Sequence, residues 1–425
     1  HRIEETLEGN GVDVKIVIFE GEKFIIEKIN IAGNTVTNDS VIRGEMLVDE
    51  GDPFSELLVN KSINKIKSRN IFGKVEQKTL PGSSRDLKVL EISVEEKATG
   101  EIMAGAGVGS DGASFQFTIK ENNWLGKGFS LDTGINVSKE KITGSLSAVD
   151  PNYNFTGNEL FASLSVSSTN RSETTGFKSQ KSGFNVGTSF EQYEDLYFSP
   201  SIEVAFEEIT SESDASTSIR KMDGTYLNSD FSYGIALDKR NQPFQTTEGY
   251  WLKFNQSLPI IQDTSSIMNN LNLITFHQIN DDMVGKIKYH ARTIHGVDDH
   301  VRLTNRLYIP RNKLRGFVKG RVGPKDGADW VGGNYISGLS AETMLPNLLP
   351  EAYKTDFNVF IDAANIWGID YNESINDSSK IRSTIGIGAV VFTPVGPLSW
   401  TASQNITKAS TDETESFSFR LGTSF

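Results

Sequence analysis

Apolar and polar residues alternate along most of the chain. From about Gly100 to Phe425, strand-like runs of about ten residues follow one another, with turns between them and no helical periodicity. In the final run, one face carries Phe417, Phe419, Leu421 and Phe425, and the other carries Ser418, Arg420, Gly422 and Ser424. A period of two places successive side chains on opposite faces of a strand. The pattern predicts about sixteen β-strands, each with one apolar and one polar face.

The connections between these runs alternate in length. Short ones, often containing Asn, Asp, Gly or Pro, occur at 122–128, 150–158, 238–249, 280–283 and 393–397. Most of the others are longer and polar, at 168–179, 207–224, 298–333 and 367–380. Short turns at one end and long loops at the other are typical of an outer-membrane barrel. A soluble sandwich also alternates, but the loop asymmetry favours a membrane all-β fold, an antiparallel transmembrane β-barrel of about 16 strands over residues 99–425.

Residues 23–98 have a different pattern, in which strands and helices are mixed. Strands are expected at 24–31, 74–80 and 87–97, and helices at 38–46 and after Ser55. Ser55 is placed to cap the second helix, whose Val59, Ile63 and Ile66 share one face. This order predicts a small α+β domain whose sheet has an edge able to pair with another chain, as a generic interaction module would also have. Residues 1–22 look like the end of a preceding domain, so we expect a processed or truncated chain.

Composition narrows the class of protein. The chain has 425 residues, a mean hydropathy of -0.32 and no apolar run near 18 residues, which excludes a membrane-spanning helix. The net charge of -13, with no basic face, argues against a nucleic-acid partner. The absence of Cys removes disulfides and thiol chemistry.

Two motifs of enzyme chemistry lack the context they need. Gly107, Gly109 and Gly112 have the spacing of a dinucleotide fingerprint, but a strand at 115–119 follows them where that motif needs a helix. His290, His295 and His300 recur every five residues, which puts neighbours on opposite faces of a strand, so no metal site is expected. We therefore expect that the protein is not an enzyme and has neither catalytic residues nor a cofactor. An outer-membrane protease or lipase is the competing enzyme class, and a passive porin is a further alternative.

The longest connection contains an unusual sequence, Leu314-Arg315-Gly316-Phe317. Loop tips normally collect small polar residues, and an exposed Phe317 would be unfavourable in water. Arg315 offers a planar fork of donors that suits carboxylates. The segment is therefore expected to fold back into the barrel, although an ordinary turn with one aromatic residue is the simpler alternative.

The alternation also predicts partners for Arg315. If Phe357, Val359 and Ile361 face lipid, Asp362 faces the lumen. If Leu339, Ala341 and Leu345 face lipid, Glu342 faces the lumen too. A loop folded into the lumen could bring Arg315 to both carboxylates. Solvated channel residues, as in a porin, would satisfy the same parity.

The α+β domain, the barrel strands and the loop motif occur in the order typical of the BamA family of outer-membrane β-barrel assembly factors. The chain resembles this family over essentially its whole length. The Leu314–Phe317 sequence matches the family's loop-six motif, and the regions 340–342 and 360–363 match the strands whose acidic residues, here Glu342 and Asp362, hold its arginine. Residues 23–97 resemble the last POTRA domain of the family, and Phe425 its C-terminal signal. The family usually has several POTRA domains, so the resemblance implies a chain truncated to the last POTRA domain and the barrel.

The resemblance implies a function in the bacterial outer membrane, with the POTRA domain in the periplasm. The expected activity is folding and insertion of client barrels, and the expected partners are unfolded outer-membrane β-barrel clients, accessory lipoproteins and outer-membrane lipid. Secretion pores of the FhaC or TamA type share the loop motif, so a translocation pore is the alternative.

In this family the barrel closes poorly between its first and last strands. The first strand here alternates Ile102, Ala104, Ala106 and Val108 with Met103, Gly105, Gly107 and Gly109. Glycine is entropically costly to order in a strand and offers no side chain to pack. We therefore expect weak pairing with the last strand, through Phe417, Phe419, Leu421, Gly422 and Phe425. Such a seam would let a client strand pair with residues 102–109.

Overall fold

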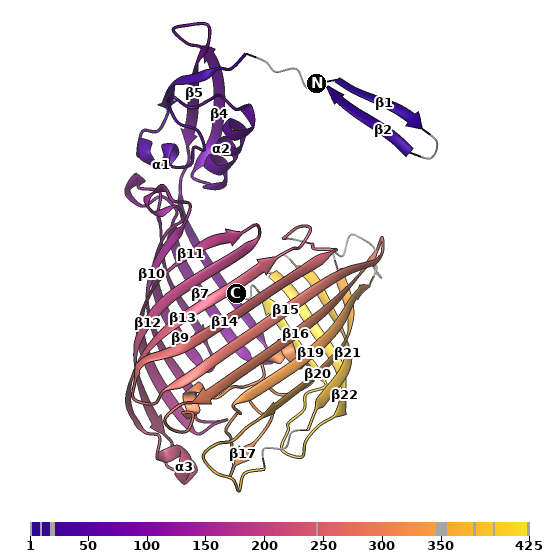
Figure 1. Ribbon diagram of the computed structural model, residues 1–425. Coiled ribbons are helices and arrows are strands. Elements are labelled where there is room, and N and C mark those ends of the chain that lie inside the picture. The colour runs from indigo at the N-terminus through magenta and orange to yellow at the C-terminus, as the bar shows by residue number, and fades with distance from the viewer. Residues whose placement is uncertain are drawn as a thin grey trace. The chain divides into compact units, whose positions relative to one another are not determined.

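The computed structural model describes residues 2–8, 11–17, 22–243, 245–345, 355–376, 380–393 and 396–422 (Figure 1). The chain divides into two compact units. The first comprises residues 1–100 together with 122–129, and the second comprises 101–121 together with 130–425. The segment 122–129 thus belongs to the first unit although the sequences on both sides of it belong to the second.

The first unit is the expected small α+β domain. Its elements are β3 (Ile25–Ala32), α1 (Asp39–Arg43), α2 (Glu56–Ser68), β4 (Phe72–Pro81) and β5 (Leu87–Glu96). The strands form one sheet in the order β3-β5-β4, with β3 parallel and β4 antiparallel to the central β5. Ser55 caps α2 by accepting a hydrogen bond from Leu58 N at 3.4 Å. Apolar residues recur at the helical period in α2 and at every second position in β5, so each element has one apolar face. These two faces are buried in one core, which includes Val59, Ile63, Ile66, Leu90, Ile92 and Val94.

The strands β1 (Arg2–Glu8) and β2 (Gly11–Val17) pair antiparallel as a two-stranded sheet. That residues 1–22 are the remnant of a preceding domain stays a prediction.

The carboxylate of Glu96, at the end of β5, binds the loop that precedes α1. It accepts hydrogen bonds from the backbone N of Thr35 at 3.0 Å, of Val36 at 3.0 Å and of Thr37 at 2.6 Å. The hydroxyl of Thr35 also donates to it, at 2.7 Å. Burial raises the pKa of Glu96, but these bonds outweigh burial and lower the pKa to about 2.

Two connections, at 122–129 and 151–158, have the same backbone turn. In each, an asparagine side chain accepts a hydrogen bond from a glycine five residues later: Asn123 from Gly128 N at 2.8 Å, and Asn152 from Gly157 N at 2.7 Å. A short 3-10 turn follows in both, η1 (Trp124–Gly126) and η2 (Tyr153–Phe155). The middle residue of each has the same left-handed backbone, φ 52° and ψ 28°.

The third residue of this turn differs between the two copies. Gly126 packs within the first unit, where its carbonyl accepts a hydrogen bond from Asn38 N at 2.9 Å and a Cβ would lie 2.0 Å from the carbonyl oxygen of Val36. Phe155 occupies the same place in the other turn and is exposed. Since Phe155 also has a positive φ, of 60°, the turn itself accepts a side chain there. Close packing is what requires glycine at 126.

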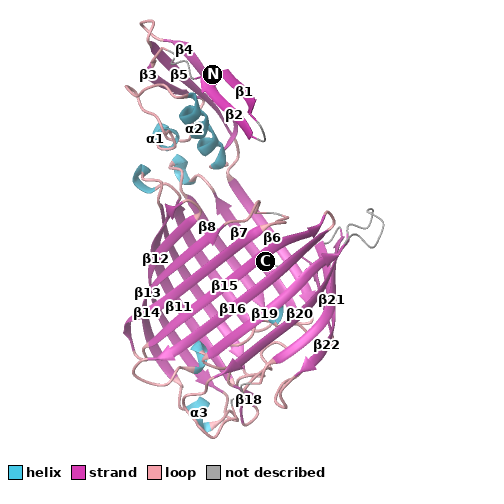
Figure 2. Cartoon of the chain, turned by 45° about the vertical axis from the view of Figure 1, so that its right-hand side comes forward, coloured by secondary structure: helices cyan, strands magenta, loops and turns pink. Residues whose placement is uncertain are grey.

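The second unit is a closed barrel of sixteen antiparallel strands among the described residues, as the alternation predicted (Figure 2). Its strands are β6 (Gly100–Gly109), β7 (Gly112–Glu121), β8 (Ser130–Ser138), β9 (Lys141–Asp150), β10 (Glu159–Arg171), β11 (Phe177–Tyr193), β12 (Leu196–Ser211), β13 (Gly224–Asp238), β14 (Gly249–Gln262), β15 (Ser266–Asn280), β16 (Met283–Gly296), β19 (Tyr335–Leu345), β20 (Thr355–Trp367), β21 (Arg382–Thr393), β22 (Gly396–Thr407) and β23 (Phe417–Gly422). None of the described helices is long and apolar enough to cross a membrane.

The two faces of the barrel wall follow the alternation of the sequence. On β20, Val359 and Ile361 are 38% and 50% exposed, whereas Phe360 and Asp362 are 2% and 0% exposed. At 359–362 the odd positions therefore face outward and the even positions face the lumen, as the parity argument predicted. Apolar residues on the outside are stable when that face contacts hydrocarbon.

The connections are less regular than the sequence indicated. The connection expected at 168–179 is confined to 172–176, because β10 and β11 extend into it as far as Arg171 and Phe177. Tight turns also occur at the long-loop end, at 110–111 and 139–140. The connection at 212–223 contains a short helix, α3 (Thr217–Arg220), in a region where no helical periodicity was expected. It is one turn long, too short for a periodic pattern to reveal.

The bonds of Glu96 predict a pH-dependent stability of the first unit. The pKa is lowered from 4.5 to about 2 on folding, so this stabilisation is present above about pH 4.5 and is lost as the pH falls toward 2. Glu96→Gln should lower the free energy of unfolding by about 1.5–3 kcal/mol at neutral pH, and the difference from the parent should shrink in that acid range. Urea unfolding followed by the fluorescence of Trp124 measures it; equal loss in the exposed Glu91→Gln on the same strand would contradict this account.

The comparison of the two turns predicts that Gly126→Ala separates residues 36–38 from the turn. A Cβ at this position must displace the backbone of Val36, and we expect the amide of Asn38 to exchange its hydrogen roughly tenfold faster or more. Phe155→Ala is the matched control, because it changes the same place in the other turn. Unchanged exchange at Asn38 in the Gly126 variant would show that the packing is not needed.

Candidate functional site

The connection between β16 and β19, residues 297–334, is folded into the barrel; we call it loop six. Its elements are η3 (Leu303–Asn305), η4 (Arg311–Lys313), β17 (Lys325–Asp326) and β18 (Asp329–Trp330). Leu314 and Phe317 are almost fully buried, in a cluster with Ile336 of β19 and Ile366 of β20. Those two residues lie on the inner face of the wall, so the apolar part of loop six lines the lumen rather than extending into solvent.

Gly316 allows the loop to turn against the neighbouring strands β21 and β22. Its φ is +86°, and a Cβ there would lie 2.7 Å from the Ser403 hydroxyl and 3.0 Å from that of Thr384. Its carbonyl accepts hydrogen bonds from Asn405 Nδ2 and from Glu415 N, both at 3.0 Å. Glycine is required by the backbone conformation and by the close approach together.

Arg315 and Asp362 form a two-pronged ion pair. Arg315 Nε donates to Asp362 Oδ2 at 2.8 Å, and Nη2 donates to Oδ1 at 2.7 Å. The backbone N of Arg315 donates to Oδ2 as well, at 3.1 Å, and the Ser340 hydroxyl donates to Oδ1 at 2.6 Å. The carboxylate is fully buried, and these four hydrogen bonds compensate for the loss of water around it.

The rest of the guanidinium is held by the neighbouring strand and by an aromatic ring. Arg315 Nη1 donates to Glu342 Oε2 at 2.9 Å, and Lys288 of β16 donates to the same oxygen at 3.1 Å. The guanidinium carbon lies 3.4 Å from the centre of the Phe360 ring. Burial lowers the pKa of Arg315, but Asp362 and Glu342 outweigh burial and raise it, so the side chain stays charged.

The structure thus brings Arg315 together with Glu342 and Asp362. Sequence reasoning did not name three further contacts: Ser340, Phe360 and Lys288. Ser340 and Phe360 lie two residues before Glu342 and Asp362, on the same inward parity, so the alternation contained the signal. Lys288 pairs in register with Ser340 across β16 and β19, which only strand pairing reveals.

Loop six also pairs with the connection between β22 and β23. Phe317 forms an antiparallel bridge with Thr414, Val318 N donates to the carbonyl of Glu413 at 3.0 Å, and Glu413 N donates to that of Arg321 at 3.0 Å. Behind this pairing, Asp412 is buried against Arg382 of β21, with Arg382 Nε 2.9 Å from Asp412 Oδ2. The sequence analysis missed the buried Arg382–Asp412 pair, because neither residue belongs to a motif.

The barrel closes between β23 and β6 through a short seam. Among the described residues, these strands pair at three positions: Arg420 with Gly109, Leu421 with Val108, and Gly422 with Gly107. By contrast, β12 and β13 pair at fourteen positions. Ser110 N also donates to the carbonyl of Phe419, at 3.0 Å.

The glycines of the seam allow close approach, which the sequence analysis did not anticipate. A Cβ on Gly109 would lie 2.4 Å from the carbonyl oxygen of Phe419. Gly422 has a φ of +105°, and a Cβ there would lie 2.2 Å from the carbonyl oxygen of Ala106. Side chains at these positions would push the strands apart.

The other seam residues named from the sequence lie mostly on the outer face. Those that are exposed are Ile102, Ala104, Ala106, Val108, Phe417 and Phe419, whereas Gly105 and Gly107 are partly covered and Leu421 is half-buried. Phe425 lies outside the described residues. His290 is buried on the lumen side and His295 is exposed, which agrees with their expected opposite faces.

A closed antiparallel barrel, preceded by a small α+β domain and holding one loop in its lumen, defines the class of POTRA-containing outer-membrane barrels. Residues 123–425 match the Omp85 superfamily domain, and residues 24–97 match the POTRA domain described as a surface antigen variable number repeat. The chain belongs to the Omp85 superfamily.

Similar proteins include curated relatives named outer membrane protein assembly factor BamA. The one from Neorickettsia risticii is 28% identical over 98% of this chain and 58% of its own length, and the one from Neisseria meningitidis is 24% identical over 97% and 58%. The chain therefore spans about half the length of the curated relatives it matches.

Solved structures share the fold. BamA from Haemophilus ducreyi lacking POTRA domains 1-3 has a TM-score of 0.86 at 22% identity, covering 100% of this chain and 89% of that one. CdiB from Acinetobacter baumannii has a TM-score of 0.60 at 12% identity, covering 95% and 74%.

The anchoring of loop six predicts the effect of Arg315→Ala. The change leaves the buried Asp362 without its counter-ion, which costs about 3–5 kcal/mol, and loop six should become more sensitive to proteinase K. Arg321→Ala is the control, because Arg321 pairs with Glu413 at 2.8 Å in a more exposed position. An Arg315 variant that resists digestion as well as the parent would refute the anchoring role.

Proposed function

We propose that this protein catalyses the folding and insertion of client outer-membrane β-barrels through the seam between β6 and β23. The observation that carries the proposal is the short seam, with three described strand pairs where other neighbours pair over most of their length. The printed names of the relatives, outer membrane protein assembly factors, support the same activity.

Opening the wall at a short seam requires little free energy, because few backbone hydrogen bonds are broken. Each backbone hydrogen bond contributes a net of about 1 kcal/mol, so separating the three described pairs costs far less than separating fourteen. An opened β6 presents unpaired N–H and C=O groups, which are a template for another strand. The template lowers the barrier to client pairing without covalent chemistry, so the activity is not enzymatic and needs no cofactor.

The outer face of β6 suits a client that grows into lipid. Ile102, Ala104, Ala106 and Val108 are exposed on that face. A client strand added to this edge would continue the apolar outer surface of the wall. Its side chains of opposite parity would face the lumen.

Loop six gives the proposed gate a fixed support. Arg315, held by Glu342 and Asp362, keeps the Leu314–Phe317 segment inside the lumen while the seam changes. The first unit, in the periplasm, would offer the outer edge of β4 or β3 to unfolded clients. Accessory lipoproteins and outer-membrane lipid complete the proposed set of partners.

A translocation pore of the FhaC or TamA type is the alternative. Transport through the lumen would require loop six to leave it, which breaks the buried contacts of Arg315. Opening the seam breaks none of these contacts. This difference favours the seam as the working route.

The test measures the folding rate of a urea-unfolded client barrel in vesicles that contain the protein or a plain porin. Val108→Cys/Leu421→Cys joins two residues paired across the seam, and the chain has no other Cys. We expect acceleration by the parent, loss of that acceleration in the oxidised variant, and its return on reduction. Ile202→Cys/Phe231→Cys, a pair across β12 and β13, is the control disulfide.

Undiminished client folding with the seam locked would contradict the proposal. No acceleration by the parent chain, with export of a secreted substrate in its place, would support the translocation pore.

A further inference from the structure

One side chain of loop six touches both sides of the seam. Arg311, in η4, donates through Nε to Asp111 Oδ1 at 2.9 Å, and its Nη2 lies 2.7 Å from the same oxygen. Its Nη1 donates to Glu415 Oε2. Asp111 is in the turn that joins β6 to β7, and Glu415 is in the connection that leads into β23. Arg311 therefore bridges the first hairpin of the barrel and the entry to the last strand.

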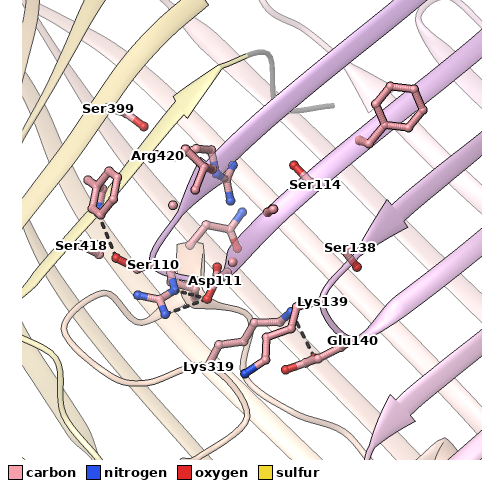
Figure 3. Close-up of a pocket in the computed structure, with 18 of the residues that line it drawn as sticks. Ser110, Asp111, Ser114, Ser138, Lys139, Glu140, Lys319, Ser399, Ser418 and Arg420 are labelled. Atoms are coloured by element: carbon pink, nitrogen blue, oxygen red, sulfur yellow. Dashed lines mark hydrogen bonds and ion pairs between the residues drawn. The ribbon is translucent and has the colours of Figure 1, made fainter.

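The bridge lies next to the described strand pairs of the seam. Those pairs involve Gly107–Gly109 of β6, and Asp111 follows two residues later. Figure 3 shows the Ser110–Asp111 turn beside Ser418 and Arg420 of β23. These residues and Arg311 line a cavity of about 460 Å³. The seam contacts made by the described residues thus lie at its loop-six end.

The bridge is sheltered but not fully buried. The side chain of Arg311 is 18% exposed, and those of Asp111 and Glu415 are 29% and 28% exposed. Charged groups at this depth attract each other more strongly than surface pairs and remain sensitive to salt. Partly exposed ion pairs of this kind can hold the β6–β7 turn and the segment before β23 together and can still dissociate reversibly.

Arg311 and Arg315 divide the loop between two parts of the barrel. Arg315 binds β19 and β20, and four residues earlier Arg311 binds the two sides of the seam. We propose that Arg311 is a latch that holds the loop-six end of the seam closed, so that the seam opens when Arg311 releases Asp111 or Glu415. The proposal rests on the proposed function of the seam and adds the residue that positions it.

Disulfide formation between Val108→Cys and Leu421→Cys, under limiting oxidant in lipid nanodiscs, reports seam closure without any client. We expect Arg311→Gln to slow this reaction roughly threefold to tenfold, and Arg311→Lys to retain part of the parent rate, since lysine keeps the charge without the fork. Raising the salt concentration should slow the parent and leave Arg311→Gln unchanged. Heat-modified migration of each variant establishes that its barrel is folded.

Lys319→Gln is the matched control. Lys319 is also a loop-six cation that pairs with a carboxylate of the first strands, Glu140 at 3.3 Å, but Glu140 lies in the turn between β8 and β9 rather than at the seam. This variant should form the disulfide at the parent rate. A folded Arg311→Gln protein that forms it as fast as the parent would overturn the latch, and so would equal slowing in Lys319→Gln.

The same variants in the client-folding assay separate the two proposals. A slower disulfide with changed client folding supports the latch and the seam mechanism together. A slower disulfide with unchanged client folding supports the latch and refutes the seam as the route of insertion.

Discussion

The interior of this barrel depends on the ion pair between Arg315 and Asp362. A buried guanidinium and carboxylate are stable only if both keep nearly all of their hydrogen bonds. Here the carboxylate receives four, and the guanidinium also reaches Glu342 and lies over the Phe360 ring. Leu314 and Phe317 exclude water on either side of the charge. The apolar and the ionic parts of the motif therefore stabilise each other. If the loop left the lumen, the apolar side chains would be exposed to water and the ion pair would be broken.

This arrangement makes the wall uneven in strength. Around β16, β19 and β20 the strands are tied to one another by their own pairing and by the buried loop. In the described part of the seam the strands pair at three positions, and glycine replaces the side chains that would otherwise interlock. Under the proposed mechanism the wall would open at this weakly paired place, whereas a uniformly paired barrel would have no preferred place to open.

The sequence predicted the parts of the structure in which apolar and polar residues alternate with the period of a strand or a helix. Inward parity placed Asp362 and Glu342 in the lumen, and it could have placed Ser340 and Phe360 beside them. The core of the first unit, from Val59 to Val94, followed from helical and strand periods in the same way. The ends of β10 and β11 were less predictable, because polar residues at the rim of a barrel suit a strand and a loop equally.

Contacts made by the connecting segments had no such signal. The buried pair of Arg382 and Asp412, and the contacts of Arg311 with Asp111 and Glu415, join segments far apart in sequence that carry no periodic pattern. The same limit explains Gly126 and Phe155. Two turns with one backbone geometry look alike until the partner of one of them is seen.

The Arg382–Asp412 pair makes the two edges of the seam unequal. Asp412 is fully buried, bonds to Gly323 N at 3.0 Å and to Ala409 N at 2.6 Å, and so fixes the segment leading into β23 to β21 and to loop six at once. The described contacts of the β6–β7 turn with loop six are side-chain contacts of Asp111. If the wall parts as proposed, we therefore expect the edge formed by β23 to keep its place with the interior and the edge formed by β6 to move outward.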